Sequence, residues 1–231
     1  MPLNGTKWLY YVQLLDSALP IGGFSHSFGL ETYVQRREIT TSEQLESFIA
    51  SQLESSLVPL DGAVIRSVYL AADKGEMERI CLLDQIVHVQ RGAKESREGL
   101  LKMGKRLLKL AKNVYPWMDF EPLEQAFARY GGFGSMPTIH AWISRQLDVG
   151  RDDAVKGYLY SSVSAQVNGA IRLMPVGQTE GQVIVQRLLP VIERECLKLA
   201  EADDPFPRSF ALAQDIHAMN HETLYSRLFM S

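Results

Sequence analysis

The sequence predicts an all-α fold, with one compact helical domain of about nine to eleven helices spanning residues 1–231. Apolar residues recur at helical spacing along most of the chain, and no alternating run of β-branched residues is bounded by a hairpin turn. A chain of 231 residues that is 46% hydrophobic is long enough to bury one sizeable core. Neither an internal repeat nor a long interdomain linker is present, which favours a single domain.

The first strongly periodic helix is predicted over residues 45–57. One face of this segment carries Leu45, Phe48, Ile49, Leu53 and Leu57. Thr40 with Glu43, or Thr41 with Gln44, forms a capping box at the start of this helix.

Further helices follow in order along the chain. They are predicted over residues 63–72, ending at Lys74-Gly75, then over 77–90, around 100–110 and around 188–199. Val183-Ile184-Val185 is the nearest approach to a strand, but it is short and has helical flanks. The glycine-rich segment 131–137 is predicted to be a flexible loop, and residues 203–207 separate two helices.

Composition excludes several classes of protein. The net charge of -3 gives no general electrostatic reason to bind nucleic acid or an anionic membrane. Cys81 and Cys196 form no CxxC pair, so we interpret both as buried small side chains in a reducing compartment. The apolar run 8–15 is broken by Gln13 and ends at Asp16, which argues against a secretory signal, and no apolar window spans a membrane. We therefore expect a cytoplasmic protein.

The stretch ALPIGGFSHSFGLE (18–31) has the composition of an active-site loop. A nucleophile elbow needs glycine on both sides of its serine, and here Gly23-Phe24-Ser25-His26 continues with Ser27 in the place of the second glycine. We instead expect residues 20–23 to end one helix in a turn and Ser25 or Ser27 to cap the next. The phosphate loop of nucleotidases is also absent from the sequence.

Two other patterns leave alternatives open. His217 and His221 are four residues apart, a spacing that can chelate nickel or zinc on a helix, although both are better explained as partly exposed surface or interface residues. A basic face formed by Lys102, Lys105, Arg106, Lys109 and Lys112 is either solvated or faces an acidic protein partner. With no complete catalytic set, the chain is interpreted as a binding protein and not an enzyme.

Three segments resemble the urease accessory protein UreF family. They are LLDSALPIGGFSHSFGLETY (14–33), SSVSAQVNGAIRLMPVGQTEGQ (161–182) and QDIHAMNHETLYSRLFMS (214–231), in the same order as in the family. The resemblance implies an all-α homodimer that acts as a chaperone in urease maturation. It also implies binding to UreD (also called UreH), recruitment of the GTPase UreG, and delivery of nickel to the urease apoprotein. No cofactor and no catalytic activity of its own are implied.

The first of these segments is predicted to be a recognition surface. Gly22 and Gly23 allow a sharp turn, which presents Phe24, His26 and Phe28 beside the next helix. Tyr33 is a residue type enriched at binding hot spots, and the resemblance implies that it contacts the GTPase. The alternative is that these aromatic side chains belong to the core.

The tail, residues 220–231, carries apolar and aromatic residues unusual at a chain end. We expect a partner such as UreD, or a neighbouring subunit, to order this tail through Tyr225, Arg227, Leu228 and Phe229, the alternative being docking on its own domain. Arg172 is assigned either a regulatory role near the GTPase or a structural ion pair, with Gln178 orienting the same region. The competing function is a nickel carrier that binds the metal directly through His217 and His221.

Overall fold

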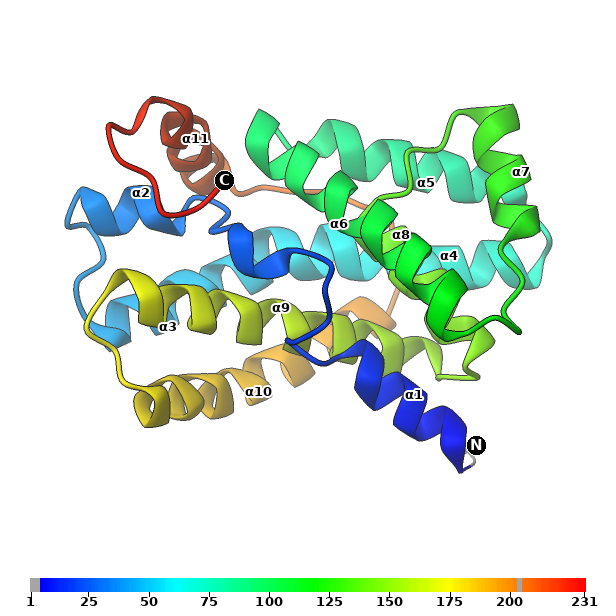
Figure 1. The fold of residues 1–231 in the computed structure, drawn as a ribbon, viewed down its shortest axis with the longest axis horizontal. Helices are drawn as coiled ribbons and strands as arrows, with labels where there is room; N and C mark the ends of the chain where they lie inside the picture. The colour runs from blue at the N-terminus through cyan, green and yellow to red at the C-terminus, as the bar shows by residue number, and fades with distance from the viewer. Residues whose placement is uncertain (1–4, 203–204) are drawn as a thin grey trace.

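The computed structural model describes residues 5–202 and 205–231, and within these ranges it contains eleven α-helices and no strand (Figure 1). The all-α prediction is therefore confirmed. The α-helices are α1 Thr6–Leu14, α2 Leu30–Gln35, α3 Ser42–Gln52, α4 Ala63–Asp73, α5 Met77–Gln90, α6 Lys94–Val114, α7 Glu121–Tyr130, α8 Met136–Gln146, α9 Arg151–Leu173, α10 Gln178–Ala200 and α11 Leu212–Asn220. Two short 3-10 turns, η1 Gly23–Ser25 and η3 His221–Thr223, and a π-helix, η2 Leu53–Gly62, complete the element order.

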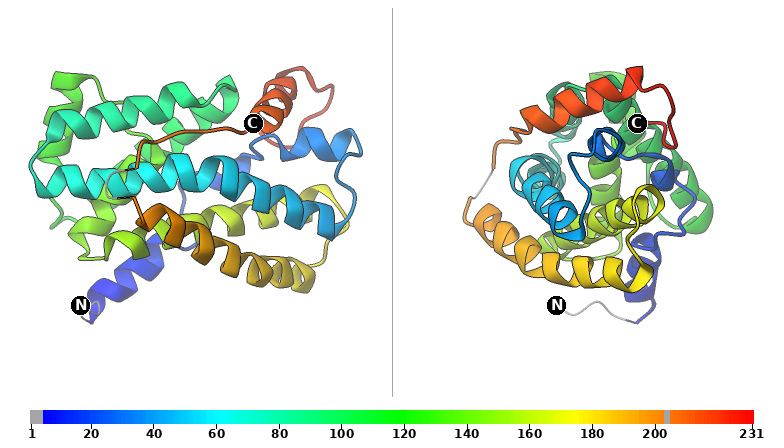
Figure 2. Two further views of the ribbon diagram at one scale, coloured as in Figure 1. Left: turned by 180° about the vertical axis from the view of Figure 1, so that it is seen from behind. Right: turned by 90° about the vertical axis from the view of Figure 1, so that its left-hand side faces the viewer.

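The two helices predicted over 45–57 and 63–72 are parts of one helical rod. α3, η2 and α4 follow one another without a break, as the left view of Figure 2 shows. Thr41 and Gln44 form the predicted capping box at its start. Pro59 lies inside η2, where the wider π turn tolerates a residue that has no N–H and whose ring crowds the preceding turn.

The apolar core draws on helices from α1 to α10, and α8 lies within it, packed against α4, α6 and α9. Nine of the eleven residues of α8 are buried, which explains why its sequence lacks a polar face. α6 approaches α8 closely at Gly104, where a Cβ atom would lie 2.2 Å from the carbonyl oxygen of Gly134. The long helices α9 and α10 run antiparallel along the opposite side of the domain (Figure 1).

The glycine-rich loop before α8 is held in place by Asp84, which corrects the expectation of a flexible loop. The buried carboxylate of Asp84 accepts the N–H groups of Phe133, Gly134 and Ser135 at 2.5, 2.9 and 2.8 Å, and the hydroxyl of Ser135 at 2.5 Å. Four donors satisfy this carboxylate without a cation. Asp84 thereby fixes the start of α8 relative to α5.

Several smaller expectations are also settled. Val183-Ile184-Val185 lies within α10, and the break predicted at 203–207 begins at residues 203 and 204, which lie outside the described ranges. Cys81 and Cys196 are both free and buried, and burial raises their thiol pKa values to about 11 and about 12. No helix in the described part of the chain is long and apolar enough to cross a membrane.

Candidate protein-docking surface

The turn between α1 and α2 depends on glycines with left-handed backbone. Gly22 has φ 87° and Gly29 has φ 92°, a region that other residues rarely adopt. The predicted serine cap is confirmed in part. Gly29 is the N-cap residue of α2 and makes no side-chain cap bond, but the N–H of Glu31 in the first turn of α2 donates to the Ser27 hydroxyl at 3.4 Å. The Ser25 hydroxyl instead donates to the carbonyl oxygen of Gly22 at 3.0 Å, within the turn itself.

The tail runs back along this turn and pairs with its backbone. The Met230 N–H donates to the carbonyl oxygen of Ser25 at 2.8 Å, and the N–H groups of Ser27 and Phe28 donate to the main-chain oxygen of Ser231 at 2.5 and 3.1 Å. His26 shares a 2.7 Å hydrogen bond with the Ser231 hydroxyl. In this structure the tail is therefore ordered on its own domain.

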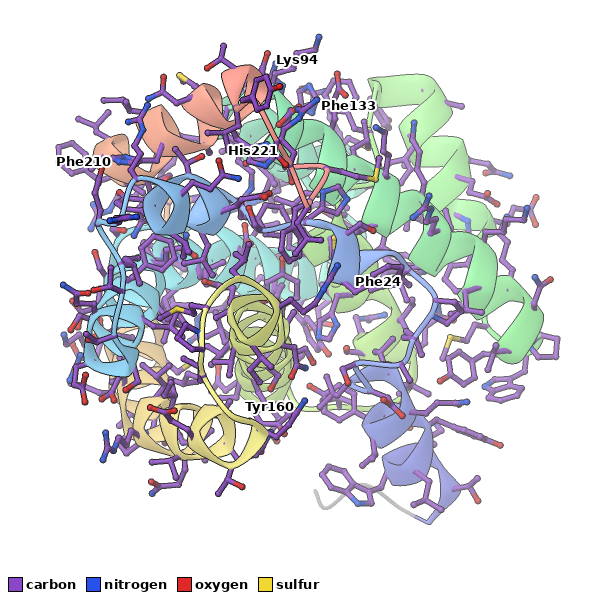
Figure 3. All side chains as sticks on the ribbon, turned by 60° about the vertical axis from the view of Figure 1, so that its left-hand side comes forward. Phe24, Lys94, Phe133, Tyr160, Phe210 and His221 are labelled. Atoms are coloured by element: carbon purple, nitrogen blue, oxygen red, sulfur yellow. The ribbon has the colours of Figure 1, made fainter. Side chains whose placement is uncertain are left out.

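A buried cluster of His221, Glu31 and Glu95 holds the tail against the domain. His221, which is labelled in Figure 3, is fully buried. Its two ring nitrogens face carboxylates, with Nε2 2.9 Å from Glu31 and Nδ1 2.6 Å from Glu95. A ring nitrogen that bonds to an ionised carboxylate does so as the donor, because a carboxylate only accepts. His221 thereby links α2 to α6.

The same two carboxylates hold the tail directly. Glu31 accepts the N–H groups of Leu228 and Phe229 at 2.6 and 3.0 Å, and Glu95 accepts the Arg227 guanidinium at 2.8 Å. Burial alone would raise the pKa of Glu31, but the two tail N–H groups and the imidazole hold that pKa below its ordinary value of 4.5. Glu31 is therefore an ionised carboxylate with every nearby donor directed at it.

Arg172 clamps the turn and the tail together. Its guanidinium donates to the carbonyl oxygen of Phe24 at 2.7 Å and lies 4.5 Å from the centroid of the Phe229 ring. The Phe229 ring is buried against Gly169, whereas the Phe24 side chain remains 70% exposed. No carboxylate partner of Arg172 is present among the described residues, so the predicted ion pair is replaced by a carbonyl and an aromatic ring.

Tyr33 belongs to a second contact, between α2 and α11. Its half-buried ring stacks on His217 with centroids 3.7 Å apart and meets Phe48 edge-on. His217 is fixed at both nitrogens, by the carbonyl oxygen of Ala213 at 2.8 Å and by Glu38 at 2.8 Å. Tyr33 therefore holds α11 in position and offers only part of its ring to a partner.

Seven of the ten predicted site residues lie together, and the other three lie apart from them. The turn and tail bring together Phe24, His26, Phe28, Arg172, Arg227, Leu228 and Phe229. Tyr33 lies apart beside α11, Gln178 is exposed at the first turn of α10, and Tyr225 projects fully into solvent. Of the turn–tail group, His26 and Phe229 are buried, so only part of it can touch another protein.

The geometry gives no support for chelation by His217 and His221. All four ring nitrogens already face protein oxygens, and the described residues contain no group of three or more His, Cys, Asp or Glu side chains placed to hold a metal ion. The two histidines instead make separate structural contacts: His217 holds α11 and His221 holds the tail.

A cavity of about 210 Å³ lies beneath the turn. Its lining includes Asp61 and Arg91, which form a buried ion pair of 2.5 Å, and Tyr158, whose hydroxyl donates to Asp61 at 2.9 Å. Gln166 Oε1 and Arg91 Nε also belong to lining residues and have no hydrogen-bond partner in the described part of the chain. The turn thus covers a cavity whose lining is mostly apolar but includes this buried ion pair.

Sequence reasoning missed Glu31 and Glu95, on which the tail depends. Glu31 stands between Leu30 and Thr32 in a short helix whose first three residues are all buried, an unusual place for a carboxylate without a partner. The burial of Glu31 is the only sign of its role, and it cannot be recognised before the fold is known. The donors for Glu31 come from residues nearly 200 positions away.

Comparison with known proteins supports the resemblance of the three segments. The family model described as UreF matches residues 39–189. The chain is 33% identical over 220 residues to a urease accessory protein UreF of Haemophilus influenzae (strain PittEE), covering 95% of this chain and 94% of that protein. It is 34% identical to that of Bacillus sp. (strain TB-90), covering 97% and 99%, and 36% identical to that of Lachnoclostridium phytofermentans, covering 96% and 98%. With matches of this extent across the whole fold, the chain belongs to the UreF family of urease accessory proteins.

Proposed function

We propose that the protein is a non-catalytic chaperone of urease maturation that bridges UreD (UreH) and the GTPase UreG. In this role it acts as a homodimer and supports GTP-dependent insertion of nickel into the urease apoprotein. The observation that carries the proposal is the turn–tail surface of a UreF family member. There the exposed side chain of Phe24 extends from a turn whose backbone is held by Arg172 and by the tail. A preorganised aromatic residue of this kind binds another protein at low entropic cost.

Phe24 is the residue of this surface best placed to meet the GTPase. Its side chain is 70% exposed while its carbonyl oxygen is held by Arg172. We assign to Arg172 a positioning role through this bond, and to the tail a role in keeping the turn in its binding conformation. Leu228 and Met230, at 51% and 57% exposed, extend the apolar surface beside it.

Co-purification of the chain with UreD and UreG, with and without GTP, tests the bridge. Phe24→Ala should weaken UreG recruitment at least about tenfold while melting temperature and oligomeric state stay unchanged. Val89→Ala, at a side chain 71% exposed on α5, is the matched control and should bind normally. Undiminished recruitment of UreG by Phe24→Ala would remove this turn from the proposal.

Two variants are needed to test the role of Tyr33, because its ring packs on His217 and is also partly exposed to solvent. Tyr33→Phe keeps the ring that stacks on His217, whereas Tyr33→Ala removes it. If the hydroxyl contacts the GTPase, both variants lose recruitment. If Tyr33 acts through the position of α11, only Tyr33→Ala does.

A nickel titration of the isolated protein separates the bridge from the carrier alternative. Stoichiometric tight binding that is lost on changing His217 and His221 to alanine would favour a carrier. The bridging role predicts no tight nickel binding, since the imidazoles of His217 and His221 are already bonded to carboxylates and a carbonyl oxygen.

A further inference from the structure

The outward face of α6 carries a row of cations that the family comparison leaves without a role. Lys102, Lys105, Arg106 and Lys109 recur at intervals of three and four residues and are all exposed. Such spacing places them on one side of the helix, about 10 Å from first to last at 1.5 Å per residue. The opposite side of α6 is apolar and faces the core, so these charges are on its solvent side.

The middle of this row lacks carboxylate partners. Lys102 has only a long contact of 3.8 Å to Glu98, and Lys112, one turn beyond the row, pairs with Glu124 at 2.5 Å. Among the described residues no Asp or Glu forms an ion pair with Lys105, Arg106 or Lys109. Three adjacent cations in a chain of net charge -3 make a local field opposite in sign to the whole molecule.

This row is continuous with the Phe24 turn. A Cβ atom on Gly22 would lie 2.1 Å from a guanidinium nitrogen of Arg106, so glycine at this position makes room for that side chain. The Met103 side chain packs on Gly23 from the same helix. Burial and then the charges of Lys102 and Arg106 lower the pKa of His26, a residue of this turn, to about 4.

We propose that Lys102, Lys105, Arg106 and Lys109, together with Phe24, form one docking surface for an acidic segment of the partner protein that contacts this turn. The inference rests on the proposed function, in which that partner is the GTPase. Carboxylates of the segment pair with the cations of α6, and an apolar residue of the segment covers the Phe24 ring. Nucleic acid is disfavoured as the occupant, because α6 contributes no aromatic side chain for base stacking and, among the described residues that form this surface, Phe24 alone supplies an exposed ring.

A charge-reversal variant tests the surface. Lys105→Glu/Arg106→Glu/Lys109→Glu should raise the Kd for UreG at least about tenfold, and Lys105→Gln/Arg106→Gln/Lys109→Gln should raise it less. Wild-type binding should weaken as salt rises from about 50 mM to about 500 mM, and the reversed variant should lose that dependence. The matched control is Lys74→Glu/Arg129→Glu/Arg208→Glu, which changes the same number of exposed cations outside α6 and should bind as wild type does.

A second measurement does not depend on the proposed function. A fluorescent poly-glutamate peptide should bind the wild type and the control variant, and should not bind the reversed variant. Any one of three results would overturn the inference. These are an unchanged Kd for UreG in the reversed variant, loss of UreD binding alone in that variant, and tighter binding of a DNA duplex than of poly-glutamate. If no form binds UreG but the peptide results hold, the surface stands and the proposed function fails.

Discussion

Glu31 is the single residue on which the position of the tail depends most. It receives two backbone N–H groups of the tail and the imidazole of His221, and it is almost fully buried. Replacing one carboxylate oxygen by an amide NH2 would place a donor against a donor of the tail or of His221. A buried donor that loses its acceptor is costly, so this site tolerates little change.

Glu31→Gln should therefore release the tail while the helical core remains folded. Hydrogen exchange at the amides of Leu228 and Phe229 should become at least about tenfold faster, equivalent to about 1.4 kcal/mol of local stability. Glu222→Gln, an exposed carboxylate in the same segment, is the control and should leave the exchange rates unchanged. Equal protection of both amides in Glu31→Gln and wild type would contradict the role given to Glu31.

At the scale of elements, Asp84 joins α5 to the start of α8. Its carboxylate satisfies three N–H groups and one hydroxyl within the segment 133–135, and buried donors that lose an acceptor cost about 1–3 kcal/mol each. Asp84→Ala should lower the free energy of unfolding by at least about 3 kcal/mol in urea denaturation. Asp73→Ala breaks only the exposed pair with Arg145 and should cost less than about 1 kcal/mol. Similar losses for the two variants would show that Asp84 is not an anchor.

Some of these elements can be predicted from local sequence patterns, and others cannot. The capping box at Thr41, the bounds of α5 and the all-α class follow from spacing within a few residues, and all three are confirmed. The continuation of α3 into α4 was missed, because Pro59 normally ends an α-helix and the π turn that accommodates it has no periodic signature. The anchors at Asp84 and Glu31 were missed because their donors lie 49 to 51 and about 197 positions away.

For the whole molecule, two buried histidines make stability depend on pH. Burial lowers the pKa of His140 and of His26 to about 4, from an ordinary value of 6.5. Well above pH 6.5 both groups are neutral in the folded and unfolded chains and contribute no pH dependence. Between pH 6.5 and 4 only the unfolded chain takes up these protons, so stability falls as pH falls, by about 3 kcal/mol for His140 alone.

Urea denaturation between pH 4 and 7 tests this dependence. His140→Gln retains an N–H donor for the carbonyl oxygen of Ala154, the present partner of His140 Nε2 at 3.1 Å. The variant should lose stability at pH 7 through altered packing against Tyr11 and Tyr158, but its stability should decline less steeply below pH 6.5. A slope equal to that of the wild type would show that His140 takes up its proton without unfolding.

The pairing of residues 25–31 with residues 228–231 has a consequence for how the protein is made. The bond between His26 and Ser231 joins positions 205 apart, so the first half of the docking surface leaves the ribosome long before its second half exists. At typical elongation rates the interval is on the order of ten seconds or more. During translation Glu31 lacks the donors that the tail later supplies. The pairing of turn and tail therefore forms only after residue 231 has been synthesised.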